Sequence, residues 1–163
     1  MSSPPAWPLL VSRLIDHAAL IHGGREIVTK SVEGGVHRSN WRETRQRSKR
    51  LAHALQKLGA RRGDRIATLA WNTHRHVECL YGIAGMGGIA HTINPRLFID
   101  QILYIANHAE DRALLFDTSF LPIVEQIAPR LKSIEHFIIL CGRDHVPPSG
   151  LDLLCYEELL AGA

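Results

Sequence analysis

Four short apolar segments recur along the chain at almost equal spacing, and this spacing constrains the fold more than any other feature. The segments begin at Ile66 (IATLA), Ile89 (IAHTI), Ala113 (ALLFD) and His136 (HFIIL), at intervals of 23, 24 and 23 residues. Each segment has the length and composition of a buried strand. Because such an interval is too long for a hairpin and long enough for a helical crossover, the strands are expected to lie parallel.

The intervals themselves show helical periodicity. The residues that share a face are Val77, Leu80, Tyr81 and Ala84 in the first interval, and Ile99, Ile102, Leu103 and Ala106 in the second. A third helix is expected over roughly Leu121 to Leu131, opened by Ser119 and Pro122. Alternating strands and helices predict an α/β fold with a largely parallel sheet and helices on both of its faces.

A helix and an N-terminal β-hairpin are expected before these repeats. Leu9 to Ile21 is an amphipathic segment, and the residues on its apolar face are Leu10, Leu14, Ala18 and Ile21. The stretch REIVTKSVEGGVHRS is typical of a β-hairpin that turns at Gly34-Gly35, because glycine adopts the backbone angles that tight turns need.

A second helix follows the hairpin. Asn40 can cap it, and Glu43 stands three residues later, where a capping box requires an acid. Its buried stripe consists of Leu51, Leu55 and Leu58. Gly59 is placed to end it, since glycine is favoured just beyond a helix.

We expect these elements to form a single domain over residues 1–163. Its parts are a flexible N-terminus (1–8), a helix, hairpin and basic helix (9–64), βα repeats (65–141), and a loop with a short helix (142–163). The chain has 45% hydrophobic and 21% charged residues, which is ordinary for a globular protein. No apolar run is long enough to predict a membrane span, and the first residues lack the pattern of a signal peptide.

The three cysteines are odd in number and far apart, at Cys79, Cys141 and Cys155. This pattern favours a reduced, cytoplasmic chain over a disulfide framework.

Basic residues are concentrated in one part of the chain. Nine of the 19 Lys and Arg residues lie between Arg42 and Arg65. Such a cluster can attract phosphate, nucleic acid or an acidic partner, or it can simply be a solvated helix face. No aromatic residue is interleaved with these arginines after Trp41, so we expect no nucleic-acid partner. If nucleic acid did bind here, its affinity would fall steeply with salt.

Polar residues follow each predicted strand. They are Trp71-Asn72, Thr92-Ile93-Asn94, Asp117-Thr118 and Gly142-Arg143. Ligands of parallel α/β sheets bind at the carboxyl ends of the strands, so these residues are candidates for a binding edge. Pro95 keeps Asn94 out of the helical region, and the chain must therefore turn sharply there.

Two motifs suggest cofactors, and we reject both. GMGGIA matches the dinucleotide pattern G-x-G-x-x-A, but it ends a predicted helix and precedes a strand, which is the reverse of what that motif requires. Gly82, Gly85 and Gly88 are instead expected to let this helix lie close to its neighbour. His74 and His76 lie two apart on a predicted helix, where side chains point to different faces, so no metal site is expected.

Several stretches together resemble the N-terminal part of an AMP-forming acyl-CoA synthetase, in the fatty-acid–CoA ligase branch of the adenylate-forming superfamily. They are L..LG...GDRIA, WN.H..E..YGI.G.GGI and, above all, HTINPRLF..QI.YI.NHAED. The resemblance runs from about Leu14 to the end of the chain. It implies a two-step reaction in which a fatty-acid carboxylate attacks ATP to form an acyl-adenylate and diphosphate. The thiol of coenzyme A then displaces AMP, and Mg²⁺ stabilises the developing charge.

The chain departs from this family because the Ser/Thr/Gly-rich phosphate loop, ending in Pro-Lys-Gly, is absent from the sequence. We therefore expect a partial N-terminal subdomain of the adenylate-forming fold, truncated before that loop and inactive by itself. No catalytic, cofactor-binding or metal-ligating residue is carried over from the family. ATP, Mg²⁺ and coenzyme A are expected as cofactors of the full-length enzyme, and none of them is expected to bind this fragment.

In the family, this region supports the acyl and coenzyme A pockets and can contribute to a homodimer. On that basis His91, Thr92 and Asn94 are weak candidates for a pocket wall, and residues of this kind are more often buried or turn residues satisfied by the backbone. A small stand-alone α/β ligand-binding module without chemistry remains the alternative to an enzyme fragment. A fragment would also expose apolar surface, so we expect self-association or marginal stability.

Overall fold

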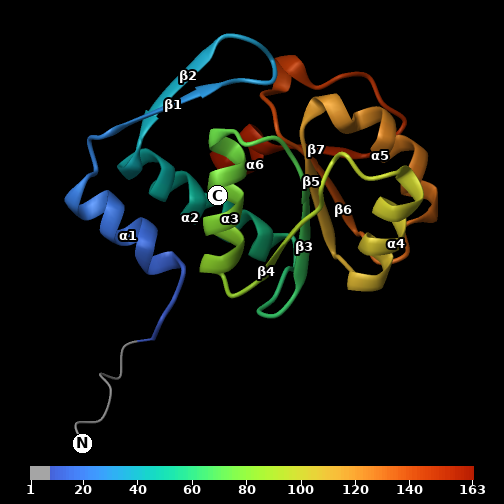
Figure 1. Ribbon diagram of the computed structural model, residues 1–163, viewed down its shortest axis with the longest axis horizontal. Coiled ribbons are helices and arrows are strands. Elements are labelled where there is room, and N and C mark those ends of the chain that lie inside the picture. The colour runs from blue at the N-terminus through green and yellow to red at the C-terminus, as the bar shows by residue number, and fades with distance from the viewer. Residues whose placement is uncertain (1–7) are drawn as a thin grey trace, which may run out of the picture.

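The computed structural model describes residues 8–163. The expected flexible N-terminus, residues 1–8, lies outside the described residues except for Pro8. The strands are β1 (Glu26–Lys30), β2 (Val36–Asn40), β3 (Arg65–Leu69), β4 (Ile89–Thr92), β5 (Ala113–Phe116), β6 (His136–Ile139) and β7 (Leu153–Cys155). The α-helices are α1 (Ser12–Ile21), α2 (Trp41–Lys57), α3 (His74–Gly85), α4 (Ile99–Ala109), α5 (Leu121–Ile127) and α6 (Tyr156–Ala161). Figure 1 shows their arrangement.

The four predicted strand segments pair in parallel, as expected from their spacing. Together with β7 they form one sheet in the order β4-β3-β5-β6-β7. The register places Ile66 beside Ala113 and Ala113 beside His136, so the strands run side by side without offset. All carboxyl ends therefore meet at one edge of the sheet.

Strand β7 was not predicted, because residues 142–163 were expected to form only a loop and a short helix. The short helix is present as α6, but Leu153–Cys155 adds a fifth parallel strand beside β6. Three residues in a turn-rich stretch carry no periodic signal of their own. The pairing of Leu154 with Ile138 is what makes them a strand.

Helices cover both faces of the sheet, as expected. Along β5, Leu114 and Phe116 pack with residues of α4 and α5, whereas Ala113 and Leu115 pack with residues of α2, α3 and α6. Figure 1 shows these two groups of helices on opposite sides of the strands. This alternation follows from the two-residue period of a strand. Full burial of a side chain such as Leu115 stabilises the fold by roughly 1.5–3 kcal/mol.

The hairpin and the start of α2 agree with the sequence analysis. Strands β1 and β2 are antiparallel, and the turn between them contains Gly34 at φ +102° and Gly35 at φ +75°. The side chain of Asn40 accepts a hydrogen bond of 3.0 Å from the backbone N–H of Glu43. This bond satisfies one of the free donors at the helix start.

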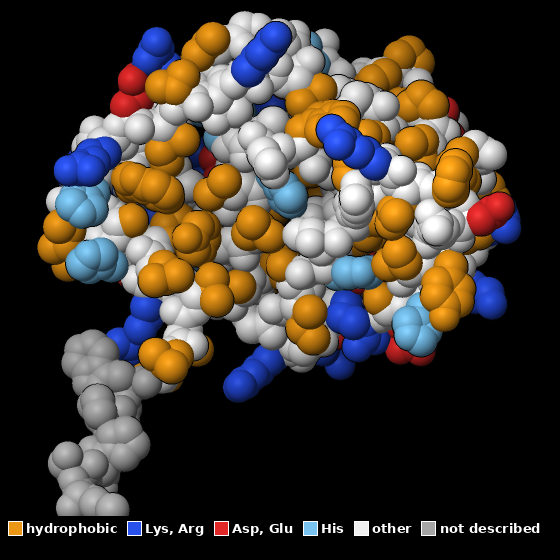
Figure 2. Space-filling view, viewed as in Figure 1, with side chains coloured by type: hydrophobic (Ala, Val, Ile, Leu, Met, Phe, Trp, Pro, Cys, Tyr) orange, Lys and Arg blue, Asp and Glu red, His pale blue; other side chains and the backbone are white. Residues whose placement is uncertain are grey.

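The apolar face expected on α1 is present but does not pack against the core. Leu14 is 64% exposed, and Leu10 and Ile21 are exposed as well. Ile15 and Ala19, one position further round the helix, are the residues that are buried. Figure 2 shows apolar side chains gathered on the α1 side of the molecule. The helix is apolar on more than one face, so periodicity alone could not select the buried one.

Glycine allows a close approach between α2 and α3 at one of the predicted positions. A Cβ atom on Gly82 would lie 2.8 Å from the carbonyl oxygen of Ser48, so only glycine fits there. The same prediction is wrong for Gly85, where a Cβ atom would meet nothing within 4 Å. At Gly88 the nearest atoms belong to Ile83, within the preceding helix itself.

All three cysteines are buried and free of disulfides. Among the helices of residues 8–163, none combines the length and the apolar character that crossing a membrane requires.

Candidate functional site

The carboxyl edge of the sheet carries a buried carboxylate. Asp117 directly follows β5, and its Oδ2 atom accepts a hydrogen bond of 2.6 Å from the backbone N–H of Trp71, which lies just beyond β3. Its Oδ1 atom is buried and has no partner among the described residues. Burial, only partly offset by the bond from Trp71, raises the pKa of Asp117 to about 6. Asp117 therefore has one carboxylate oxygen without a hydrogen-bond donor among the described residues, and its pKa lies close to neutral pH.

An aromatic pair stands next to this carboxylate. The indole N–H of Trp71 donates to the Ser119 hydroxyl at 2.9 Å, and the ring centroids of Trp71 and Phe120 are 5.0 Å apart. Phe120 is buried, whereas Trp71 is 42% exposed. The indole thus offers a half-open apolar surface at the edge where α/β proteins bind ligands.

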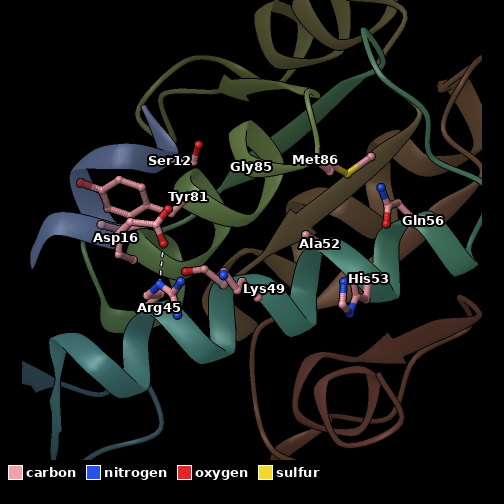
Figure 3. Close-up of a pocket in the computed structure, with 12 residues that line it drawn as sticks. Ser12, Asp16, Arg45, Lys49, Ala52, His53, Gln56, Tyr81, Gly85 and Met86 are labelled. Atoms are coloured by element: carbon pink, nitrogen blue, oxygen red, sulfur yellow. Dashed lines mark hydrogen bonds and ion pairs between the residues drawn. The ribbon is translucent and has the colours of Figure 1, made fainter. Parts of the chain in front are cut away.

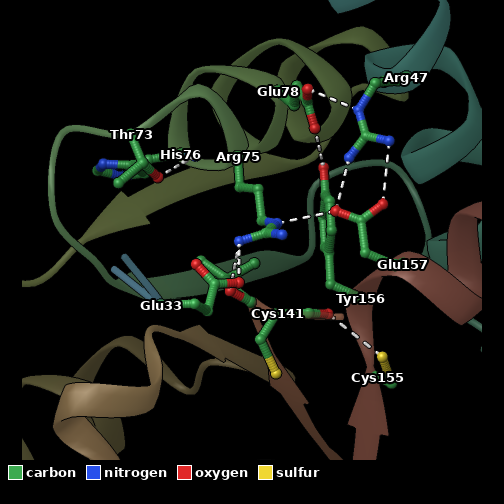
Figure 4. Close-up of polar contacts among 11 residues, drawn as sticks. Glu33, Arg47, Thr73, Arg75, His76, Glu78, Cys141, Cys155, Tyr156 and Glu157 are labelled. Carbon is green, nitrogen blue, oxygen red and sulfur yellow. Dashed lines mark hydrogen bonds and ion pairs between the residues drawn. The ribbon is translucent and has the colours of Figure 1, made fainter. Parts of the chain in front are cut away.

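A second group of polar residues lies beside the carboxyl end of β6, and Figure 4 shows how they converge. Arg75 of α3 contacts Glu33 in the hairpin turn at 2.6 Å and Glu157 of α6 at 2.8 Å. It also donates a hydrogen bond of 3.2 Å to the carbonyl oxygen of Leu140. Arg75 therefore ties the hairpin, the helix α6 and the end of β6 together.

Arg47 of α2 continues this network. It contacts Glu78 at 2.7 Å and Glu157 at 2.9 Å. The hydroxyl of Tyr156 donates to the other oxygen of Glu78 at 2.8 Å. Glu78 and Tyr156 are both fully buried. The residues of this ionic network, which we name the arginine network, are Glu33, Arg47, Arg75, Glu78, Tyr156 and Glu157.

Burial and pairing act against each other in the arginine network. Burial raises the pKa of Glu78 despite the opposing effect of Arg47, and burial also raises the pKa of Tyr156. For Arg47, burial opposes the charge, but the hydrogen bonds to Glu78 and Glu157 outweigh it and raise its pKa. Glu157 has a lowered pKa because its two arginine partners outweigh burial. Both arginines are committed to carboxylates, so the network fastens elements together and offers no free charge to a substrate.

Two histidines stack between the hairpin and α3. The rings of His37 and His74 are 3.7 Å apart at their centroids and nearly parallel. Burial, and then the nearby positive groups, lowers the pKa of His74 to about 3, so this ring is neutral at pH 7. From the sequence, no metal role is expected for His74 and His76. In residues 8–163 no group of three or more His, Cys, Asp or Glu side chains is arranged to hold a metal ion.

The sequence profile described as AMP-binding enzyme matches residues 15–151, which is most of the chain. The chain belongs to this family. The 3-methylmercaptopropionyl-CoA ligase of Ruegeria pomeroyi is 47% identical over 155 residues, which cover 94% of this chain and 29% of that protein. The medium-chain-fatty-acid–CoA ligase of Ectopseudomonas oleovorans is 43% identical over 153 residues, covering 93% and 28%. This AMP-binding family chain thus spans less than a third of the length of these relatives.

The fold also agrees with solved structures. The anthranilate CoA ligase AuaEII, in complex with anthranoyl-AMP, superimposes with a TM-score of 0.81 at 22% identity, over 96% of this chain and 29% of that one. The resemblance to the adenylate-forming enzymes and the expected fold class are therefore confirmed.

The three residues proposed for a pocket wall lie on or just after the edge strand of this AMP-binding family chain. His91 is half-buried, and its Nδ1 atom is held by Asp111 at 2.7 Å. Thr92 is exposed at the end of β4, and Asn94 is exposed with its Oδ1 atom accepting the backbone N–H of Arg96 at 3.0 Å. Asn94 thus performs the turn chemistry that its position before Pro95 suggested.

No pattern in the sequence predicted the arginine network. Its members are far apart in the chain; Arg47 and Glu157 are separated by 110 residues. One local signal was available, since Glu78 lies on a helix directly between the apolar residues Val77 and Cys79. A carboxylate in that position must be paired if the helix face is buried. The partner could not be named from the sequence.

Proposed function

We propose that this chain is the N-terminal part of a fatty-acid–CoA ligase that acts on medium- or long-chain fatty acids. The reaction joins the fatty acid to coenzyme A through an acyl-adenylate, with release of AMP and diphosphate. The observation that carries the proposal is the 43% identity, over nearly the whole chain, to the medium-chain ligase of Ectopseudomonas oleovorans. The fold agrees with such a ligase, since the anthranilate CoA ligase AuaEII superimposes on this chain with a TM-score of 0.81.

A second acid is a candidate substrate because of a specific similarity. The Ruegeria pomeroyi protein that is 47% identical is named a 3-methylmercaptopropionyl-CoA ligase. This acid is a short thioether carboxylate, whereas a medium-chain fatty acid is longer and wholly hydrocarbon beyond its carboxyl group. Both would undergo the same adenylation chemistry, so the two proposals differ only in the acyl pocket.

We propose a supporting role for this chain within that reaction, with no catalytic step on its residues. The described part of the chain has no group of three or more His, Cys, Asp or Glu side chains that could hold a metal ion by itself. We also propose that the chain alone is inactive and binds neither ATP, Mg²⁺ nor coenzyme A. We also propose that the chain is cytoplasmic, that it forms a homodimer and that it has no nucleic-acid partner. Equilibrium sedimentation at several concentrations tests the homodimer.

His91, Thr92 and Asn94 remain our proposal for part of a pocket wall. Their place at the carboxyl end of β4 supports it, because ligands of parallel α/β sheets bind at that edge. Of the three, Thr92 is the most informative to change, since its side chain makes no hydrogen bond among the described residues and is exposed.

A chimeric enzyme tests the proposed function. Residues 15–151 of this chain replace the matching segment of the Ectopseudomonas oleovorans ligase, and ATP–diphosphate exchange is measured with octanoate, palmitate and 3-methylmercaptopropionate. We expect exchange with at least one of these acids, and the preferred acid separates the two substrate candidates. A chimera that is folded by circular dichroism but exchanges with none of them would contradict the proposal.

Two further measurements complete this test. The isolated 163-residue chain, assayed with Mg²⁺ and the same acids, is expected to show no exchange. Clear exchange would place a phosphate site within these residues and overturn the supporting role. In the chimera, Thr92→Phe is expected to raise the KM for the acid if Thr92 lines the pocket. An unchanged KM for Thr92→Phe would remove it from the pocket wall.

A further inference from the structure

A groove of about 470 Å³ lies between α1, α2 and α3, away from the carboxyl edge of the sheet. Figure 3 shows its residues: Asp16 and Arg45 meet at one end, and Gln56 and Met86 stand toward the other. Neither Asp117 nor any member of the arginine network lines it. A volume of this size falls in the range of small-molecule sites rather than of protein interfaces.

The floor of the groove is apolar. It includes Ile15 of α1, Ala52 of α2 and Met86 at the end of α3. Both Ile15 and Ala52 line the groove although Ile15 is only 4% exposed and Ala52 only 9% exposed. Such a floor favours a hydrocarbon chain, and a methionine side chain adapts to ligands of different shape.

One wall of the groove is cationic and unneutralised. Arg45 is ion-paired with Asp16, which leaves that end electrically balanced. Lys49 and His53, one and two turns further along α2, line the groove and make no hydrogen bond or ion pair among residues 8–163. Lys49 is therefore a free positive charge directly above an apolar floor.

We propose that this groove binds an anionic amphiphile, namely a medium-length alkyl chain that ends in a carboxylate. The alkyl chain lies on Ile15, Ala52 and Met86, and the carboxylate is held by Lys49, with His53 as a second donor. Charge complementarity selects an acid over an alcohol, and the apolar floor selects a long acid over acetate. The site lies apart from the carboxyl edge and goes beyond the proposed function, which does not require it.

Titration of the 163-residue chain with sodium decanoate, below its micelle concentration, tests the proposal. Binding is followed by amide chemical shifts in two-dimensional NMR. We expect saturable shifts in α1, α2 and α3, and at least tenfold weaker binding of decanol and of acetate. Shifts that do not saturate, or that spread over the whole surface, would overturn the proposal. Decanol binding as tightly as decanoate would remove the role of the charge.

Substitutions on α2 make the test specific. Lys49→Met keeps the aliphatic stem and removes the charge, and it is expected to weaken decanoate binding about tenfold. Arg50→Met is the matched control, because Arg50 is an exposed cation on the same helix that does not line the groove. Equal weakening by both changes would indicate only a non-specific basic surface. Ala52→Leu, which fills the floor, is expected to abolish saturation, and its folding is checked by the unchanged spectrum elsewhere.

The result of the decanoate titration can be distinguished from the result of the chimera assay, which tests the proposed function. ATP–diphosphate exchange by the chimera depends on the carboxyl edge and the rest of the ligase. A chimera that is active but whose isolated chain fails to bind decanoate would overturn only the groove. Saturable decanoate binding with an inactive chimera would overturn only the ligase proposal.

Discussion

The Nδ1 atom of His91 lies 2.7 Å from Oδ2 of Asp111, and this pair joins the edge strand β4 to the turn after α4. Asp111 is fully buried, whereas the side chain of His91 is 24% exposed. Burial raises the pKa of Asp111 against the opposing effect of His91. An edge strand has only one neighbouring strand to pair with. The contact between His91 and Asp111 therefore adds a side-chain interaction that helps to hold β4 in place.

Replacement of Asp111 by asparagine should therefore destabilise the fold. Asp111→Asn removes the charge that His91 contacts and leaves a buried amide to find new partners, so we expect a loss of about 1–3 kcal/mol in the free energy of unfolding. Urea denaturation measures this loss. Asp100→Asn is the control, because Asp100 is 84% exposed and its ion pair with Arg130 spans 3.3 Å. A loss no larger than that of the control would show that the pair is not structural.

Asp117 should make stability fall as the pH rises. Its pKa in the folded chain is about 6, compared with an ordinary value of 3.8, so the folded state holds the proton more tightly than the unfolded state between these values. Stability from this group is therefore complete below about pH 4 and is lost as the pH rises through about 6. The difference corresponds to about 3 kcal/mol, at about 1.4 kcal/mol for each pH unit.

The variant Asp117→Asn isolates this effect, because an amide does not titrate. We expect the difference in unfolding free energy between the variant and the native chain to shift in favour of the variant from pH 4 to pH 7. Urea denaturation at several pH values gives both curves. Parallel curves would mean that Asp117 has an ordinary pKa in the folded chain.

Loss of Arg47 should be among the most damaging single changes to α2. Arg47→Met leaves Glu78 fully buried without its counter-charge, and such unpaired buried charges cost about 3–5 kcal/mol. Arg50→Met, on the exposed face of the same helix, is expected to change stability by less than about 0.5 kcal/mol. The double change Arg47→Met with Glu78→Met should recover part of the loss, since no charge then remains unpaired. A mild effect of Arg47→Met alone would contradict the network.

Replacement by alanine should affect stability differently at two glycines of α3. Gly82→Ala places a Cβ atom 2.8 Å from the backbone of α2, so the helices must separate, at a cost of about 1–3 kcal/mol. At Gly85 the added Cβ atom meets nothing within 4 Å, so alanine should be neutral or stabilise by up to about 1 kcal/mol. Thermal unfolding of both variants compares them directly. Equal effects would mean that the close approach at Gly82 is absent.

Local patterns in the sequence were enough to predict the parallel sheet, the hairpin turn and the cap of α2. Buried strands need apolar runs, tight turns need glycine at Gly34 and Gly35, and a helix start needs a side-chain acceptor such as Asn40. Each of these requirements acts over a few neighbouring residues. The family resemblance could be recognised for the same reason. It depends on short motifs and on their order and spacing, which can be read directly from the sequence.

The remaining features depend on contacts between residues far apart in the chain. Leu153–Cys155 is a strand only because β6 lies beside it, and Glu78 tolerates burial only because Arg47 and Tyr156 reach it from α2 and α6. The face of α1 that packs was likewise chosen by its neighbours rather than by its own periodicity. Pairing between residues far apart in the chain leaves no local sequence pattern. The residues around each partner reflect only its own helix or strand, and the two partners meet only in the folded chain.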